Sequence, residues 1–187
     1  MTRRLTLEPT ALAGVHVLQR APIGDARGYL ERLFCDNELA GWLDGGGIRQ
    51  VNHTLTAAAG TVRGLHFQRP PHAEAKIVAC LRGEVFDVAV DLRKGSPTFL
   101  RWHAERLSAA NHRSLLIPPG VAHGFQTLVT DCELLYVHTA PHVPEAEGGV
   151  HPADPRLGIE WPLPVEGLSV RDRSHPALTD DFRGLPL

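Results

Sequence analysis

The sequence predicts an all-β domain, built as a sandwich or a barrel. Short runs rich in β-branched and aromatic residues recur at near-regular spacing, and glycine, proline and asparagine separate them. Residues 36–43 are the one good helix candidate before the C-terminal tail. Apolar residues make up 43% of the 187 residues and charged residues 21%, which is the composition of a globular domain with a sizeable core.

The expected elements follow one another closely along the chain. Two strands come first, at 16–19 and 29–35, and the helix DNELAGWL follows with Asp36 as its N-cap. Eight further strands are expected at 48–56, 61–68, 75–83, 84–93, 98–107, 113–118, 124–129 and 132–139.

The run EVFDVAVDLR, 84–93, alternates cleanly between two kinds of side chain. Its odd-numbered positions from 85 to 91 share one face, which carries Asp87 and Asp91 among small apolar residues. Asp91 is expected to be exposed to solvent on this face. For Asp87 two interpretations stay open, a solvated face or the wall of a pocket.

The chain is expected to form a single domain over 1–187. It has no fixed-period repeat, no low-complexity tract and no shift of composition that would mark a linker. The barrel core is expected at about 45–140. The proline-rich segment 141–187 is expected to be a tail that wraps the surface or covers an opening.

Charge and cysteine content exclude several classes of protein. The net charge of −2 argues against nucleic acid as a partner. No window is apolar enough for a membrane span, and the first residues lack the apolar stretch of a secretory signal. Cys35, Cys80 and Cys132 are odd in number and widely spaced, so reduced thiols and a cytoplasmic location are expected.

The stretch VRGLHFQRPPHAEAK, 62–76, carries polar side chains where a packed strand would hold aliphatic ones. Arg63, His66, His72 and Lys76 could form a catalytic set, a metal site or surface charge beside a turn. Arg63, His66 and Lys76, together with Asp87 on a later strand, can meet on one face of a barrel. A histidine oriented by a carboxylate, with cations nearby, is suited to removing a proton from carbon beside a carbonyl.

The segment IPPGVAHGF, 117–125, contains the Pro-x-Gly-x-x-His turn that is typical of cupins, a family of small β-barrels. Metal-binding cupins add an earlier His-x-His motif, which this chain lacks, so His123 is interpreted as a pocket or core histidine. Residue types alone favour ordinary roles for Tyr136 as a core aromatic and for Asp172 as a turn residue.

Taken together, several segments resemble the dTDP-4-dehydrorhamnose 3,5-epimerase family of deoxysugar nucleotide biosynthesis. The resemblance runs from about Gly14 to Leu178. The matching segments, in the order of the family, are RGYLERLF, RQVNHTLT, TVRGLHFQ, AKIVACLRGEVFDVAVDLRKGSPTF, LSAANHRSLLIPPGVAHGF, ADPRLGIEWP and LSVRDRSHPAL.

The resemblance implies a cupin jelly-roll β-barrel with short helices and a wrapping C-terminal tail, usually active as a homodimer. It also implies an isomerase without cofactor or metal that inverts C3, C5 or both in a dTDP-4-keto-6-deoxyhexose, through an enolate. Within it His66 matches the base, Asp172 its partner carboxylate and Tyr136 the acid on the opposite face. Lys76 matches a further catalytic group beside the C4 oxygen. The positions that match substrate-binding residues are Arg27, Gln50, Asn52, Arg63, Asp87, His123, His142 and Arg171.

Three positions depart from the family pattern. His142 stands where many members have a second tyrosine. Glu31 lies one residue early, with Arg32 at a position that often holds glutamate, and HPADP at 151–155 replaces an aromatic-Asn-Asp-Pro sequence. These changes lead to the hypothesis of a specialised member that acts at C3 or C5 alone, or on a modified sugar nucleotide.

Two other classes of function are kept as alternatives. The first is a metal-dependent cupin, a dioxygenase or an isomerase, and the incomplete ligand set argues against it. The second is a non-catalytic cupin that binds a sugar nucleotide. The presence of His66, Lys76, Tyr136 and Asp172 together argues against the loss of catalysis.

Overall fold

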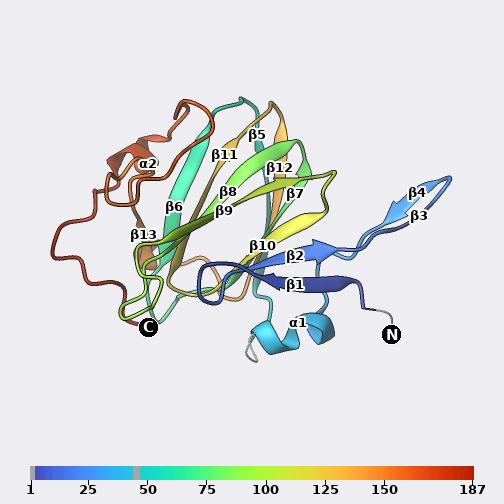
Figure 1. Cartoon of the computed structure of the whole chain (residues 1–187), viewed down its shortest axis with the longest axis horizontal. Helices are drawn as coiled ribbons and strands as arrows, with labels where there is room; N and C mark the ends of the chain where they lie inside the picture. Colours follow the sequence, from blue (N-terminus) through green and yellow to red (C-terminus); the bar gives the residue numbers. More distant parts are fainter. Residues whose placement is uncertain (1–2, 44–46) are drawn as a thin grey trace.

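Two antiparallel β-sheets pack face to face in the computed structural model, which describes residues 3–43 and 47–187 (Figure 1). This arrangement confirms the all-β prediction. The six-stranded sheet has the order β1 (Leu5–Pro9), β2 (His16–Arg20), β10 (Arg113–Ile117), β7 (Lys76–Arg82), β12 (Cys132–His138) and β5 (Gln50–Thr56). The five-stranded sheet has the order β13 (Glu147–Gly149), β6 (Val62–Gln68), β11 (Val121–Thr127), β8 (Glu84–Asp91) and β9 (Trp102–Ser108).

The remaining elements lie outside the two sheets. A hairpin of β3 (Ile23–Asp25) and β4 (Gly28–Leu30) projects away from the barrel (Figure 1). The helices are α1 (Asp36–Leu43), the 3₁₀ turn η1 (Pro144–Ala146) and α2 (Val170–Ser174). Within 3–43 and 47–187, no helix combines the length and the apolar character needed to cross a membrane.

Most expected strands are present, with shifted ends. The strand expected at 29–35 is reduced to the three residues of β4, and the strand expected at 98–107 begins only at Trp102. Turns occupy the residues before Trp102, because the amides of Phe99 and Arg101 each donate to the carbonyl three residues back, at Ser96 and Thr98. Strand β1 was not predicted, and with β2 it extends the six-stranded sheet to residues before the expected barrel core at 45.

The start of α1 differs from the expected cap. Asp36 is the first residue of the helix rather than its N-cap. The carbonyl of Cys35 accepts hydrogen bonds from the amides of Glu38 and Leu39, both at 3.1 Å, so Cys35 holds the capping position.

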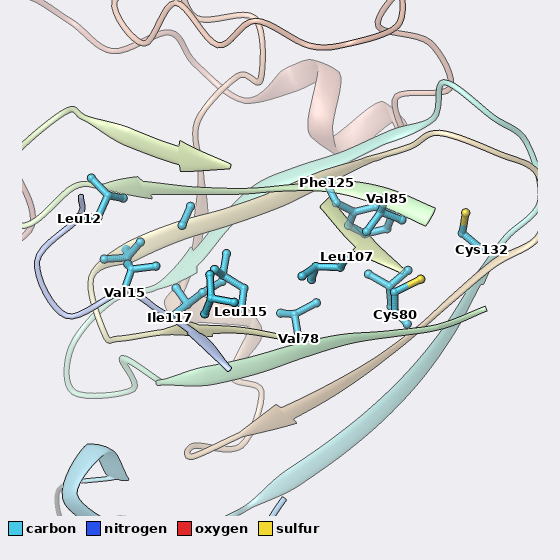
Figure 2. Close-up of a cluster of buried hydrophobic side chains, with 14 residues drawn as sticks. Leu12, Val15, Val78, Cys80, Val85, Leu107, Leu115, Ile117, Phe125 and Cys132 are labelled. Carbon is cyan, nitrogen blue, oxygen red and sulfur yellow. The ribbon is translucent and has the colours of Figure 1, made fainter. Parts of the chain in front are cut away.

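The space between the sheets is filled by one apolar cluster (Figure 2). Phe125 and Val85 of the five-stranded sheet meet Leu115 and Val78 of the six-stranded sheet. Cys80 belongs to this cluster, and burial raises the pKa of its thiol to about 12. It is a free thiol, as the sequence predicted, and behaves as a small apolar side chain.

The tail covers the outer face of the five-stranded sheet. Its residues Leu157, Trp161 and Phe182 pack against a second apolar cluster that includes Leu65 and Val90 on the strands. Figure 1 shows the tail, in orange and red, beside β6 and β13, with α2 close to β6. This packing brings a helix from the end of the chain to the mouth of the barrel.

The expectation for Asp91 is wrong, because its side chain is buried rather than solvated. Its carboxylate accepts hydrogen bonds from Arg93 (2.7 and 2.9 Å), Ser96 (2.5 Å) and Thr98 (2.6 Å). Burial alone would raise the pKa of Asp91, but these hydrogen bonds outweigh it and lower the pKa to about 2. The carboxylate ties the turn after β8 to the barrel.

Replacing Asp91 by asparagine is expected to lower the free energy of unfolding by about 2 kcal/mol at pH 7. The folded-state pKa lies below the unfolded value, so this stabilisation is complete above about pH 4 and is lost as the pH falls toward 2. Urea unfolding of the wild type and of Asp91→Asn, at pH 7 and near pH 2.5, measures the difference in their free energies of unfolding. An equal difference at the two pH values would contradict the assignment.

Candidate active site

A cavity of about 500 Å³ opens between the two sheets at one end of the barrel. Strands of both sheets, the segment after β12 and helix α2 provide its walls. Most of its polar side chains are ionisable. The lining residues are Asn52, Thr54, Arg63, His66, Phe67, Gln68, Glu74, Lys76, His123, Phe125, Tyr136, His138, His142, Glu147, Ser169, Arg171 and Asp172.

A close approach of β6 and β11 forms the histidine-bearing wall. His66 pairs with His123 in register, and the register shifts between His123 and Phe125. A Cβ atom on Gly64 would lie 2.6 Å from the Cα of Gly124, and the φ of Gly64 is +123°. Only glycine fits there, so the contact of the two strands depends on it.

His66 is paired with Asp172 across the sequence. Its Nε2 atom lies 2.6 Å from Oδ1 of Asp172, and the carboxylate is buried. Ser169 caps α2 by accepting the amide of Asp172 at 3.0 Å, which fixes the helix at the cavity. Partial burial would raise the pKa of Asp172, but the bonds from His66, Gly64 and Ser169 outweigh it and lower the pKa to about 2. The carboxylate is therefore ionised at neutral pH.

The short contact determines which nitrogen of His66 can act as a base. An ionised carboxylate only accepts hydrogen bonds, so in the 2.6 Å contact Nε2 of His66 is the donor, although Nη2 of Arg171 lies 3.1 Å from the same nitrogen. Nδ1 has no hydrogen-bond partner in the part of the chain that the structure describes. Nδ1 is therefore the nitrogen of a neutral His66 ring that is free to accept a proton.

Tyr136 stands on the opposite sheet. It belongs to β12, and its ring contacts the ring of His123 edge-on, with 6.0 Å between the centroids. Burial, with the nearby Asp87 carboxylate, raises the pKa of Tyr136, so its hydroxyl is protonated at neutral pH. His123 in turn lies 2.9 Å from Asp87, which is fully buried behind it.

Two cations line the cavity between these walls. Lys76, at the start of β7, is buried, and its Nζ lies 2.9 Å from Oε1 of Glu74. Arg63 donates to the hydroxyl of Thr56 at 3.0 Å from β6. His138 lies nearby, and burial together with the charge of Lys76 lowers its pKa to about 4. His138 is therefore neutral at pH 7.

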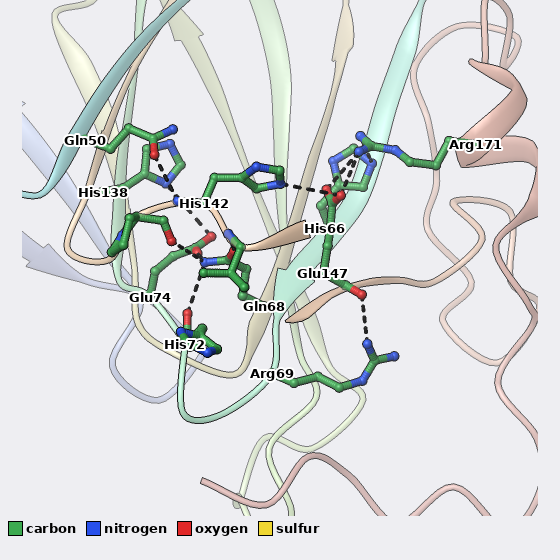
Figure 3. A network of polar contacts seen from close by, with 12 residues as sticks. Gln50, His66, Gln68, Arg69, His72, Glu74, His138, His142, Glu147 and Arg171 are labelled. Atoms are coloured by element: carbon green, nitrogen blue, oxygen red, sulfur yellow. Dashed lines mark hydrogen bonds and ion pairs between the residues drawn. The ribbon is translucent and has the colours of Figure 1, made fainter. Parts of the chain in front are cut away.

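The rim of the cavity carries a chain of charged groups (Figure 3). His142 and Arg171 both point toward the carboxylate of Glu147, at 3.6 and 2.9 Å. Arg171 also reaches His66, with 3.1 Å between its Nη2 and Nε2 of the histidine. The amide of His142 donates to Oε1 of Gln50 at 2.9 Å, which fixes the segment after β12.

The structure gathers most of the residues expected at the site. Three expected residues lie elsewhere: Asp87 is buried behind His123, Gln50 lines a smaller adjoining recess, and Arg27 lies on the exposed β3–β4 hairpin, paired with Asp25. The expected residues that line the main cavity are Asn52, Arg63, His66, Lys76, Tyr136, His123, His142, Arg171 and Asp172.

The departures at Glu31 and Arg32 have a local explanation. Glu31 forms ion pairs with Arg20 at 3.3 Å and with His112 at 2.8 Å, and Arg32 pairs with Glu38. Neither residue lines the cavity of its own chain. Glu31 holds the segment between the hairpin and α1 against the barrel, and Arg32 ties the same segment to α1.

The sequence did not indicate three ionisable residues that line the cavity, Glu74, His138 and Glu147, nor His175 beside Asp172. For two of them a signal exists, since Glu74 alternates with Lys76 and His138 shares the β12 face of Tyr136. His175 lies 3.8 Å from Asp172, one turn along a helix that was not expected. Glu147 follows an irregular turn, and no pattern places it.

A metal ion has one candidate position among the described residues. Ligand atoms of His66, Asp172 and His175 lie within 4.8 Å of one another. However, the guanidinium of Arg171 already lies 3.1 Å from His66 and 3.6 Å from Asp172. A metal cation there would meet a positive charge, so the donor set fits a proton-transfer pair better than a metal centre.

Comparison with known proteins gives the same family throughout. The model of the family described as dTDP-4-dehydrorhamnose 3,5-epimerase matches residues 9–180. The enzyme of that name from Sinorhizobium fredii is 42% identical over 171 residues, which cover 91% of this chain and 88% of the relative. A dTDP-4-dehydrorhamnose 3-epimerase from Streptomyces niveus is 36% identical over 90% of this chain and 82% of its own length.

A solved structure extends the likeness to the whole fold. The dTDP-6-deoxy-D-glucose-3,5-epimerase of Legionella pneumophila, crystallised with dTDP-4-keto-L-rhamnose, superposes with a TM-score of 0.90. It is 36% identical, and the match covers 97% of each chain. Both the jelly-roll prediction and the predicted family are thereby confirmed. The chain belongs to the dTDP-4-dehydrorhamnose 3,5-epimerase family.

Proposed function

We propose that this enzyme epimerises a dTDP-4-keto-6-deoxyhexose at one or both carbons beside the C4 ketone, without a cofactor. The observation that carries the proposal is the placement of His66, with Asp172, and Tyr136 on opposite sheets of one cavity. Inversion of a carbon requires a base on one face and an acid on the other. The related enzymes named above act on sugars of this class.

The first step is removal of a proton from carbon. Nδ1 of His66 takes the proton from C3 or C5, and Asp172 stabilises the imidazolium that results. The electron pair moves onto the C4 oxygen as an enolate. Lys76 and Arg63 supply positive charge and N–H donors for that oxygen.

The second step returns a proton from the other side. The hydroxyl of Tyr136 is protonated at neutral pH and lies on the opposite wall, so it delivers its proton to the face away from His66. The enolate collapses to the ketone with the carbon inverted. Solvent restores the tyrosine proton and removes the one on His66, which leaves the enzyme unchanged.

Proton NMR of the purified enzyme with a dTDP-4-keto-6-deoxyhexose in deuterated water tests this function. We expect deuterium at C3, at C5 or at both, with inversion at the labelled carbon. Deuterium at both positions would reject the hypothesis of a single-position enzyme that His142 suggests. Tight dTDP binding without any exchange would instead favour the non-catalytic binding protein.

We also propose that the enzyme works as a homodimer, with the β3–β4 hairpin and the outer face of β5 in the interface. The hairpin exposes Ile23, Tyr29 and Leu30, which are 50 to 68% exposed. On β5, Val51 and Leu55 face outward at 57% and 53% exposure. Such apolar surface favours burial against a second copy. A monomer in sedimentation velocity at micromolar concentration would contradict this.

A cytoplasmic location is proposed as well. The described thiols Cys35, Cys80 and Cys132 are all free, and free thiols persist in a reducing compartment. Cell fractionation tests the proposal, and recovery of the enzyme outside the cytoplasmic fraction would reject it.

A further inference from the structure

Lys76 and Glu74 form a buried ion pair whose carboxylate the reaction described above does not use. The Nζ–Oε1 distance is 2.9 Å, and the two side chains are 7% and 8% exposed. A buried ammonium is costly unless an opposite charge lies close to it. Lys76 therefore depends on the carboxylates around it to stay charged.

Several ionisable groups from neighbouring elements face Lys76. Glu74, on the loop before β7, is the carboxylate in direct contact, whereas Asp87 on β8 is held by His123. The histidines and the arginines of the cavity add no negative charge. The titratable groups that line the same cavity are Arg63, His66, Glu74, His123, Tyr136, His138, His142, Glu147, Arg171 and Asp172, and Asp87 lies behind His123.

Glu74 is itself fixed by two further contacts. The side-chain amide of Gln68 donates to Oε2 of Glu74, and Gln68 also accepts the amide of Val143 at 2.6 Å (Figure 3). Nδ1 of His138 lies 3.9 Å from Oε1 of Glu74. Because His138 is neutral at pH 7, Lys76 is the cation that the carboxylate pairs with.

We infer that Glu74 is a positioning residue that holds Lys76 on the cavity wall and keeps it as an ammonium ion. This inference rests on the proposed function, in which Lys76 stabilises the enolate oxygen. Without Glu74, burial of the amine in a cavity that Arg63 and Arg171 also line favours its neutral form. A neutral amine offers the enolate no charge, so the reaction would lose part of its electrostatic stabilisation.

The composition of the chain makes the inference directly measurable. Lysine occurs twice in the sequence, as Lys76 in the cavity and as the exposed Lys94. NMR of protein labelled with carbon-13 at lysine Cε therefore gives two signals, and each reports its own loss of a proton as the pH rises. Lys94 is an internal reference in every sample.

In Glu74→Gln, which keeps the shape and removes the charge, we expect Lys76 to lose its proton at a lower pH than in the wild type, because the buried ammonium no longer has a carboxylate beside it. The signal of Lys94 should not move. The pH above which the rate of deuterium exchange into the sugar declines should fall as well. Glu84→Gln, which removes a carboxylate from an exposed pair with Arg106, is the matched control and should change neither measurement.

Glu74→Asp keeps the charge and should restore the wild-type titration, which separates loss of charge from loss of packing. An unchanged Lys76 titration in folded Glu74→Gln would overturn the inference. Failure of the wild type to exchange deuterium would overturn the proposed function instead, while the NMR titration would still test the link between Glu74 and Lys76.

Discussion

His66→Ala should reduce solvent deuterium exchange into the sugar by about 10² to 10⁴, the contribution typical of a positioned general base. The cause is the loss of the nitrogen that Asp172 orients across a 2.6 Å contact. Binding of dTDP should persist, because the cations of the cavity remain. Exchange measured by NMR and dTDP binding measured by calorimetry separate the two effects.

A matched histidine in the same stretch provides the control. His72 follows β6 by four residues, and only its backbone enters the hydrogen bonds of the described chain, through its carbonyl to Gln68 and its amide to Arg69. His72→Ala should therefore keep wild-type exchange. Full activity in His66→Ala would refute the assignment of the base.

Tyr136→Phe should separate exchange from inversion. His66 still removes the proton in this variant, so deuterium continues to enter the sugar. The proton that returns from the opposite wall is missing, so inversion should fall by about 10² to 10⁴. The expected product is labelled sugar of unchanged configuration.

Both outcomes are read from one NMR time course, in which labelling and configuration are followed together. The substitution removes only a hydroxyl from a buried ring, so the packing of the ring against His123 is retained. Wild-type inversion in Tyr136→Phe would show that another group donates the proton. Loss of both exchange and inversion would place Tyr136 in the first step instead.

The alternation of residue types predicted most strands, but it did not predict the contacts that their side chains make with the turns around them. Alternation in 84–93 correctly grouped Val85 and Ala89 on one face of β8 and Val88 and Val90 on the other, because the strand is regular. The same alternation could not show that Asp91 is buried. Its partners Arg93, Ser96 and Thr98 come from a turn that folds back onto the strand, and periodicity within a strand carries no information about that turn.

The site was predictable only where family resemblance supplied long-range information. Residue types suggested His66, Arg63, Lys76 and Asp87 as a group, because they lie on strands. Asp172 looked like a turn residue, since nothing local indicates that it meets a strand 106 residues earlier. For the same reason the sequence did not indicate α2. This helix has five residues and is stable only through its cap and its packing.

Because the tail supplies Asp172, the proposed base His66 has its partner carboxylate only when the tail is docked on the barrel. Detachment of the tail would take Ser169, Arg171 and Asp172 out of the cavity, since none of the three belongs to either sheet. The orientation of the proposed base therefore depends on how firmly the tail packs against the five-stranded sheet.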